Sequence, residues 1–208
     1  MTTTSAIHQA SRAKRLKAVT HGAHEQLDQR IMAAEPFASR ERYGLFVKVQ
    51  RRAHRGIDAL YDSAVLAALL PDLAGRRRLP LIVQDLTDLG LQPLAPDSSA
   101  AFGSETDIAT AFGWLYVAEG SNRGAAFLLK DAAKPDLGEA FGARHLAGTP
   151  EGRGLHWWTF TTALDAHQMA EEEEQRVIAG AVSAFTRVRG LVETLMPWPS
   201  KTENTALA

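Results

Sequence analysis

The most constraining feature of the chain is a proline-free, mostly apolar stretch at residues 113–130, with the sequence GWLYVAEGSNRGAAFLLK. It predicts the core of one long helix, yet Gly120 and Gly124 lie one turn apart in its middle. Each glycine costs a helix interior roughly 1 kcal/mol relative to alanine. Glycines at this spacing remove side chains from one stripe of the helix, so a flat partner can approach the backbone. Close packing against another helix would use the same stripe, and both interpretations stay open at this point.

Composition is typical of a globular protein and narrows the possible chemistry. Hydrophobic residues make up 45% of the 208 residues and the formal net charge is -1, so nothing in the overall charge favours nucleic acid as a partner. The chain has no cysteine, which excludes disulfides, thiolate-ligated haem and cysteine nucleophiles. The polar N-terminus lacks a signal-peptide pattern, and no apolar run reaches the ~20 residues that span a bilayer. We therefore expect a cytoplasmic protein without membrane insertion.

Hydrophobic periodicity and capping signals predict helices and almost no strands. Helices are expected over residues 12–33, from the Ser39 cap to about Leu60, and over residues 64–70, 72–89, 104–133, 154–167 and 170–196. Pro80 should either break the helix expected at 72–89 or occupy the first position of a helix. Residues 91–102 are rich in proline and serine and predict a loop, whereas residues 134–153 mix turn signals with a short helix.

The chain shows neither an internal repeat nor a linker between domains. We therefore expect one all-α domain over residues 1–208, with its core at about 12–196. The polar ends, residues 1–11 and 197–208, are expected to be flexible tails.

The histidines do not have the spacing of a metal site built from several ligands. What remains is a single histidine that could ligate a haem iron and leave the other axial position open. His21 and His24 are one turn apart in the first helix, and His24 shares a side with Leu27 and Ile31. His54 lies in a basic segment and is equally ambiguous. Because a histidine on a helix is more often a capping or core residue than a ligand, these residues alone do not select one.

Several motifs, in this order along the chain, resemble those of the bacterial haem oxygenases. They are the THGAHE segment at residues 20–25, DLTDLG at 85–90, GWLYVAEGSNRGAAFL at 113–128, FGARHL at 141–146 and PEGRGLHW at 150–157. The resemblance extends from about residue 12 to about residue 195. It implies a compact multihelical domain in which haem b lies between the first, proximal helix and a long distal helix that is kinked at its glycines.

The resemblance also assigns residues to the proximal side and to the haem propionates. It places the axial iron ligand at His24, and a lysine and a tyrosine that hold the propionates at Lys17 and Tyr116. Lys17 precedes His24 by seven residues, which is a rise of about 10.5 Å and comparable with the distance from iron to a propionate. This pairing resembles the usual haem orientation of the family, so we expect cleavage at the α-meso carbon.

On the distal side, the resemblance places the helix bend at Gly120 and Gly124, directly over the haem face. Ser121 and Asn122 would line the distal pocket, where ordered waters deliver protons. The implied activity is O₂-dependent and electron-dependent cleavage of haem to biliverdin, carbon monoxide and ferrous iron. Haem would then be both substrate and cofactor, and a neutral histidine ligand suits this chemistry better than a thiolate.

An external reductant is implied, such as a ferredoxin or a flavoprotein reductase, that would dock on a basic surface of a monomer. Candidates for that surface are Lys14, Arg15, Lys17, the pair Arg51 and Arg52, and the run Arg76, Arg77 and Arg78. For any one of these groups, an ordinary solvated face is the more frequent interpretation. Arg123 and Trp158 depart from the family pattern, which places an apolar and a basic residue there, and either could alter a propionate contact.

Three other function classes are weighed against an enzyme. A non-catalytic haem-binding or storage protein would share His24 and the glycines, and only spectra recorded during reduction would separate it from an oxygenase. A thiaminase-like member of the wider helical superfamily would require a catalytic cysteine, which the chain lacks. A structural four-helix interaction module does not explain why Gly120 and Gly124 flank Ser121 and Asn122.

Overall fold

The fold is helical, as the sequence predicts. The computed structural model describes residues 11–91, 102–103 and 106–198. Its helices are α1 (Arg12–Ala33), α2 (Arg40–Ile57), α3 (Ala64–Leu69), α4 (Leu79–Asp88), α5 (Ile108–Ala132), α6 (Arg153–Ala166) and α7 (Glu171–Leu195). Short 3₁₀ segments are η1 (Asp58–Asp62), η2 (Ala74–Arg76) and η3 (Arg144–Leu146). In the described ranges β-pairing is limited to isolated bridges of Gly138, and no helix has the length and apolarity needed to cross a membrane.

Most helix boundaries follow the sequence signals. The Ser39 hydroxyl accepts a hydrogen bond from the Arg42 backbone N–H, which caps α2 as expected. Pro80 lies in the first turn of α4, so the helix expected over 72–89 begins only at Leu79. α5 begins four residues later than the helix expected over 104–133, because the Asp107 carboxylate caps it by accepting from the Thr110 N–H.

Two predicted features differ from the structure or fall outside it. The short helix expected within residues 134–153 is reduced to η3, because turns occupy the rest of that segment. The loop expected at 91–102 and the tails at 1–11 and 197–208 lie almost entirely outside the described residues.

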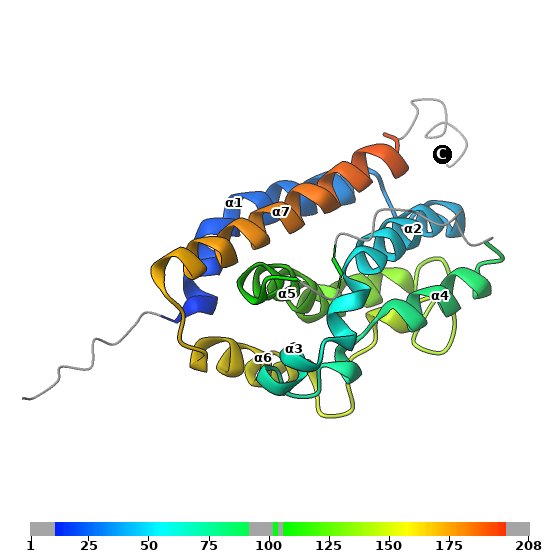
Figure 1. Ribbon diagram of the computed structural model, residues 1–208. Coiled ribbons are helices and arrows are strands. Elements are labelled where there is room, and N and C mark those ends of the chain that lie inside the picture. The colour runs from blue at the N-terminus through cyan, green and yellow to red at the C-terminus, as the bar shows by residue number, and fades with distance from the viewer. Residues whose placement is uncertain (1–10, 92–101, 104–105, 199–208) are drawn as a thin grey trace, which may run out of the picture.

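The long C-terminal helix α7 organises the packing. It crosses α5 on one side and runs alongside α1, as Figure 1 shows. At the crossing the two backbones touch: a Cβ added to Gly113 would lie 2.2 Å from the Val177 carbonyl oxygen, and one added to Gly180 would lie 2.5 Å from the Thr110 carbonyl oxygen. Since no larger residue fits there, these two glycines determine how closely α5 and α7 approach.

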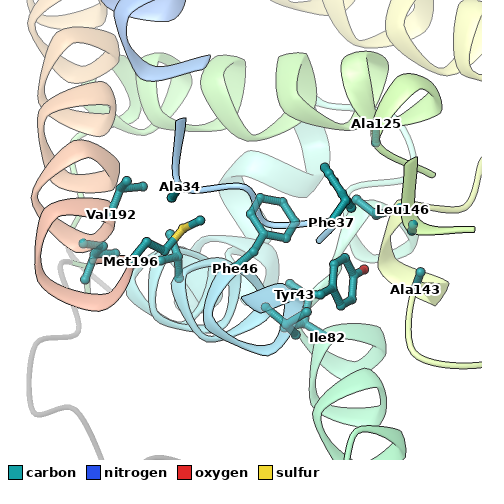
Figure 2. Packing of buried hydrophobic residues seen from close by; sticks show 14 of the residues in the cluster. Ala34, Phe37, Tyr43, Phe46, Ile82, Ala125, Ala143, Leu146, Val192 and Met196 are labelled. Carbon is teal, nitrogen blue, oxygen red and sulfur yellow. The ribbon is translucent and has the colours of Figure 1, made fainter. Parts of the chain in front are cut away.

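Two apolar clusters form the interior. One lies where α2 meets the end of α7, and its aromatic rings Phe37, Tyr43 and Phe46 pack with centroids 5.8–6.2 Å apart (Figure 2). The other joins α1, α5, α6 and α7 through residues such as Leu16 and Phe112. Burial of this apolar surface is the main favourable term in folding. α5 contributes residues to both clusters, and it is therefore packed along most of its length.

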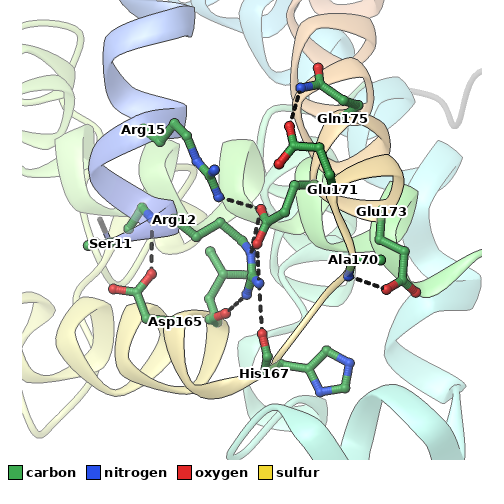
Figure 3. A network of polar contacts seen from close by, with 12 residues as sticks. Ser11, Arg12, Arg15, Asp165, His167, Ala170, Glu171, Glu173 and Gln175 are labelled. Carbon is green, nitrogen blue, oxygen red and sulfur yellow. Dashed lines mark hydrogen bonds and ion pairs between the residues drawn. The ribbon is translucent and has the colours of Figure 1, made fainter. Parts of the chain in front are cut away.

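A buried ion pair fastens the start of α1 to the corner between α6 and α7 (Figure 3). The Arg12 guanidinium lies 2.6 Å from the Glu174 carboxylate and donates to the backbone carbonyls of Leu164 and His167. Arg15 pairs with the same carboxylate at 2.6 Å. These contacts orient α1 from its first turn, and thereby place the exposed face that carries Lys17 and His24.

Candidate functional site

One side of α5 presents bare backbone to open space. A Cβ built on Gly124 would meet no heavy atom within 4 Å, and one built on Gly120 would meet only the edge of the Trp157 ring at 3.9 Å. Close helix packing is therefore the wrong interpretation of these two glycines, since that contact is made at Gly113 instead. The helix continues without interruption through both glycines. The strip is thus free for a flat partner, and Ser121 is exposed between the two glycines.

An exposed aromatic ring borders this strip. Phe127, three residues after Gly124 on α5, is 77% exposed, whereas the other large apolar residues of α5 are buried or partly buried. Phe127 lies seven residues after Gly120, about two helical turns, so its ring adds apolar surface on the face of the two glycines.

The proximal candidates lie on the exposed face of α1. The His24 side chain is 57% exposed, its Nδ1 lies 3.3 Å from the Asp28 carboxylate, and its ring meets Phe185 of α7 edge-on at 6.0 Å between centroids. A carboxylate at Nδ1 is the usual support for a histidine that binds metal through Nε2. His21 has its Nε2 at 3.4 Å from Glu25, so the nitrogen that a metal would need is directed at a carboxylate.

His54, the third candidate ligand, is buried on α2. Burial, together with the nearby His145 and Arg78, lowers its pKa to about 3, so the imidazole is neutral at ordinary pH. A buried side chain with no open face cannot receive a flat ligand. The geometry therefore favours His24 among the three histidines.

Tyr116 and the two residues that depart from the family pattern are placed near α6. The Tyr116 ring packs 5.6 Å from the Trp157 ring, and burial raises its pKa while Arg123 opposes that rise. The Arg123 guanidinium is exposed and lies 5.9 Å over the Trp157 ring, whereas Trp158 faces solvent. No hydrogen bond or ion pair joins Lys17 to Tyr116 among the residues described, so their shared role in holding propionates stays a prediction.

Asn122, unlike its exposed neighbour Ser121, is buried. It lines a cavity of about 10 Å³, which is room for roughly one water. The lining residues are Arg78, Glu119, Asn122, Arg123, Thr149, Arg153, His156 and Trp157. Several lining groups have a buried polar atom without a hydrogen-bond partner in the described part of the chain, including Glu119 Oε1, Asn122 Nδ2 and His156 Nε2.

Of the residues around this cavity, Asn122 was named from the sequence as a site residue, whereas Glu119 was not. Glu119 is almost fully buried, and burial raises its pKa to about 7 although Arg76, 2.8 Å away, opposes the shift. A carboxylate directly before Gly120 in an apolar helix indicates a buried, positively charged partner. This signal was present in the sequence.

The arginine run at residues 76–78 is not the basic surface that the sequence suggested. Arg76 is 1% and Arg78 is 7% exposed, so neither is available for docking and neither is a solvated face. Arg77 is the partly exposed member, and it pairs with Asp58 and Asp62. Three adjacent charged residues are rarely buried, so the sequence suggested a surface, whereas here Arg76 pairs with buried Glu119 and Arg78 lines the cavity.

Two motifs recognised separately in the sequence form one unit in the structure. The Asp85 carboxylate on α4 accepts hydrogen bonds from the backbone N–H groups of Arg144 and His145 at 2.9 Å, and lies 2.7 Å from His145 Nδ1. Asp88 accepts from the Gly142 N–H at 2.8 Å. The DLTDLG segment thus holds the FGARHL segment in place beneath α5.

These features fit an iron porphyrin. α1 offers an exposed imidazole with a carboxylate at its other nitrogen, and α5 offers bare backbone beside an exposed ring of Phe127. Such groups suit a flat, largely apolar ligand with one metal axial position to fill.

The sequence and the fold both match known haem oxygenases. The family model described as heme oxygenase matches residues 10–194. Heme oxygenase PigA of Pseudomonas aeruginosa is 41% identical over 182 residues, which cover 88% of this chain and 91% of that protein. The NO- and CO-bound heme oxygenase of Neisseria meningitidis superposes with a TM-score of 0.85 at 40% identity, over 92% of this chain and 95% of that one.

A more distant match concerns the fold alone. The heme oxygenase of Leptospira interrogans has a TM-score of 0.75 at 18% identity and covers 89% of this chain and all of its own length. The helical arrangement is therefore retained where most of the sequence has changed. With the family model matching most of its length, the chain belongs to the haem oxygenase family, whose enzymes degrade haem.

Proposed function

We propose that the chain acts as one haem-binding domain that holds haem b between α1 and α5. His24 Nε2 would ligate the iron, and the bare strip at Gly120 and Gly124 would lie over the opposite face. The observation that carries this proposal is the open space beside both glycines, in which a Cβ would meet almost nothing. A helix that gives up side chains at two positions without packing there has a surface suited to a flat ligand.

When bound, haem supplies both the iron that activates O₂ and the porphyrin carbon that is cleaved, with external electrons, to give biliverdin, carbon monoxide and ferrous iron. The residues of this chain would position the haem and supply protons for the reaction. Asp28 holds the His24 ring through Nδ1, which leaves Nε2 as the ligand atom. The glycine backbone restricts the space above the haem, and the exposed Ser121 hydroxyl can hold a water that delivers protons.

We propose that Lys17 and Tyr116 bind the haem propionates and so direct cleavage to the α-meso carbon. Burial raises the pKa of Tyr116, which keeps the phenol protonated as a hydrogen-bond donor. Lys17 is exposed on the same face of α1 as His24, and its long side chain leaves the ammonium free to reach a carboxylate.

The reductant is proposed to be a ferredoxin or a flavoprotein reductase. Of the basic groups suggested by the sequence, Lys14 and Lys17 are exposed on α1, beside the proposed haem edge. Arg76 and Arg78 are buried and make no part of this docking surface.

The deciding experiment follows the absorption of the protein with one equivalent of hemin, in air, with ascorbate or with ferredoxin and its reductase. We expect the Soret band to fall while the broad red absorption of biliverdin grows. A Soret band that persists throughout would instead identify a non-catalytic haem-binding protein.

The His24→Ala variant tests the ligand in the same assay. We expect it to lose both the histidine-ligated spectrum and turnover, because the iron would have no protein ligand. His21→Ala is the matched control, one turn away and equally exposed, and should behave like the wild type. If His24→Ala retained both properties, His24 would not be the ligand, and loss of both in His21→Ala would assign the iron to His21.

A further inference from the structure

The proposed haem-facing strip of α5 cannot be positioned by its own side chains, because Gly120 and Gly124 have none. Contacts on the rest of the helix therefore have to hold the strip in place. Glu119 and Asn122 lie beside Gly120 in the helix, and both are buried. The close backbone contact of α5 with α7, at Gly113, lies almost two turns earlier.

Arg76 holds α5 through Glu119. Its guanidinium lies 2.8 Å from the Glu119 carboxylate, and it also donates to the Pro71 and His156 carbonyls and to the Thr159 hydroxyl, at 2.9–3.1 Å. One buried side chain thus connects α5, α6 and the segment that follows α3.

Arg153 holds the same part of α5 one turn further on. It donates to the Asn122 backbone carbonyl at 2.6 Å and to the carbonyl of Leu146. Arg153 is the first residue of α6, and Gly152 before it has φ of 89°, a conformation that favours glycine. The PEGRGLHW motif therefore starts α6 in the place from which Arg153 reaches α5.

We infer that Arg76 and Arg153 form a clamp that sets the distance between the glycine strip of α5 and the haem. They are positioning residues, since neither would touch haem or O₂. The clamp acts at residues 119 and 122, which flank Gly120 on α5. This inference rests on the proposed haem site, and it identifies what holds that site's distal wall.

The first test needs no haem. Hydrogen exchange of α5 amides around residues 118–126 is compared in apo wild type, Arg153→Met, Glu119→Gln and the control Arg176→Met. Arg176 holds the same helix at its N-terminal cap, through Asp107 at 3.1 Å, far from the glycines. We expect exchange at least about tenfold faster in the first two variants and unchanged in the control.

The second test uses hemin-loaded protein. In Arg153→Met and Glu119→Gln we expect the pKa of the iron-bound water to shift by about 0.5 unit or more and the biliverdin isomers to become mixed, with hemin affinity within about threefold of wild type. Arg153→Lys, which keeps the charge but not the forked geometry, should be intermediate.

The clamp would be overturned if Arg153→Met and Glu119→Gln both exchanged at the wild-type rate. It would also be overturned if exchange were faster but the pKa of the iron-bound water and the biliverdin isomer ratio stayed unchanged. If Arg153→Met and Glu119→Gln do not fold, Arg153→Lys is judged by the same criteria. If the wild type fails to bind hemin, the proposed function fails, while hydrogen exchange still decides whether the arginines hold the helix.

Discussion

Glycines on the same helix have opposite uses in this protein. At Gly113 the backbone of α7 lies so close that a Cβ would be 2.2 Å from a carbonyl oxygen, whereas at Gly124 a Cβ would meet nothing within 4 Å. The first glycine is required by packing. The second weakens an isolated helix without any packing gain, which is the pattern expected when a residue is kept for a ligand.

Alanine at these two positions separates the two uses. We expect Gly124→Ala to stabilise the apo-protein by about 0.5–1 kcal/mol, because the methyl group has room and alanine favours the helix. The same change should weaken hemin binding or slow turnover. Gly113→Ala should instead destabilise the protein by about 1–3 kcal/mol through overpacking. Urea unfolding and hemin titration measure both effects, and unchanged hemin chemistry in Gly124→Ala would argue against the proposed distal strip.

Between elements, the start of α1 depends on one carboxylate. Glu174 on α7 receives both Arg12 and Arg15, and Arg12 also bonds the end of α6 (Figure 3). Burial alone would raise the pKa of Glu174, but the two guanidinium groups outweigh it and lower the pKa below its ordinary value. The ionised form is therefore the one that stabilises the fold.

Glu174→Gln should destabilise the protein by about 3 kcal/mol at neutral pH, because two arginines lose their counter-charge. A lowered folded-state pKa gives stability that is complete above the unfolded value, near 4.5, and that is lost as pH falls through the folded value. The difference between wild type and variant should thus shrink below pH 4.5. The control Glu171→Gln, an exposed position on the same helix turn, should change stability by less than about 0.5 kcal/mol.

The proposed propionate contacts come from two different helices, α1 and α5. Lys17→Ala and Tyr116→Phe should alter the biliverdin isomer ratio more than hemin affinity, because they orient a ligand that His24 already holds. Chromatography of the products measures the ratio, and Lys14→Ala, also exposed on α1, is the control. Wild-type ratios in both variants would show that neither side chain orients haem, and mainly β or δ product from the wild type would reject α-meso cleavage.

Across the whole molecule, buried titratable groups make stability depend on pH in opposing directions. Burial lowers the pKa of His54 to about 3, so below pH 6.5, the ordinary value for histidine, the unfolded chain binds a proton there and the folded chain does not. The contribution of neutral His54 to the free energy of unfolding is therefore complete above pH 6.5 and is lost as the pH falls. Glu119 has its pKa raised to about 7, so as the pH falls it binds a proton in the folded chain before it does so in the unfolded chain. Its contribution to the free energy of unfolding therefore increases as the pH falls from 7 to 4.5.

Replacing His54 should show how much it contributes to the pH dependence of the free energy of unfolding. We expect the free energy of unfolding of His54→Gln to fall less steeply between pH 6.5 and 5 than that of the wild type, by up to about 1.4 kcal/mol per pH unit. Urea unfolding at pH 7, 6 and 5 gives the slopes. Parallel slopes would mean that His54 accepts a proton in the folded protein, which its burial argues against.

The sequence by itself determined the helical class, most helix boundaries and the family. Hydrophobic periodicity, the Ser39 cap and Pro80 act on nearby residues, so their effects can be predicted from the sequence. The glycine stripe could be recognised in the same way, because a helix with two central glycines is costly wherever it lies.

Tertiary structure alone decided which glycines face a backbone and which face open space, and which charges are buried. Arg76, Arg77 and Arg78 are neighbours in sequence, yet the outer two are buried while Arg77 pairs with the buried Asp58 and the exposed Asp62. Their partners Glu119, His156 and Asp58 are 19–80 residues away in the chain. Burial and pairing of charges depend on such distant contacts, because the cost of removing a charge from water is offset only by groups that the fold brings to it.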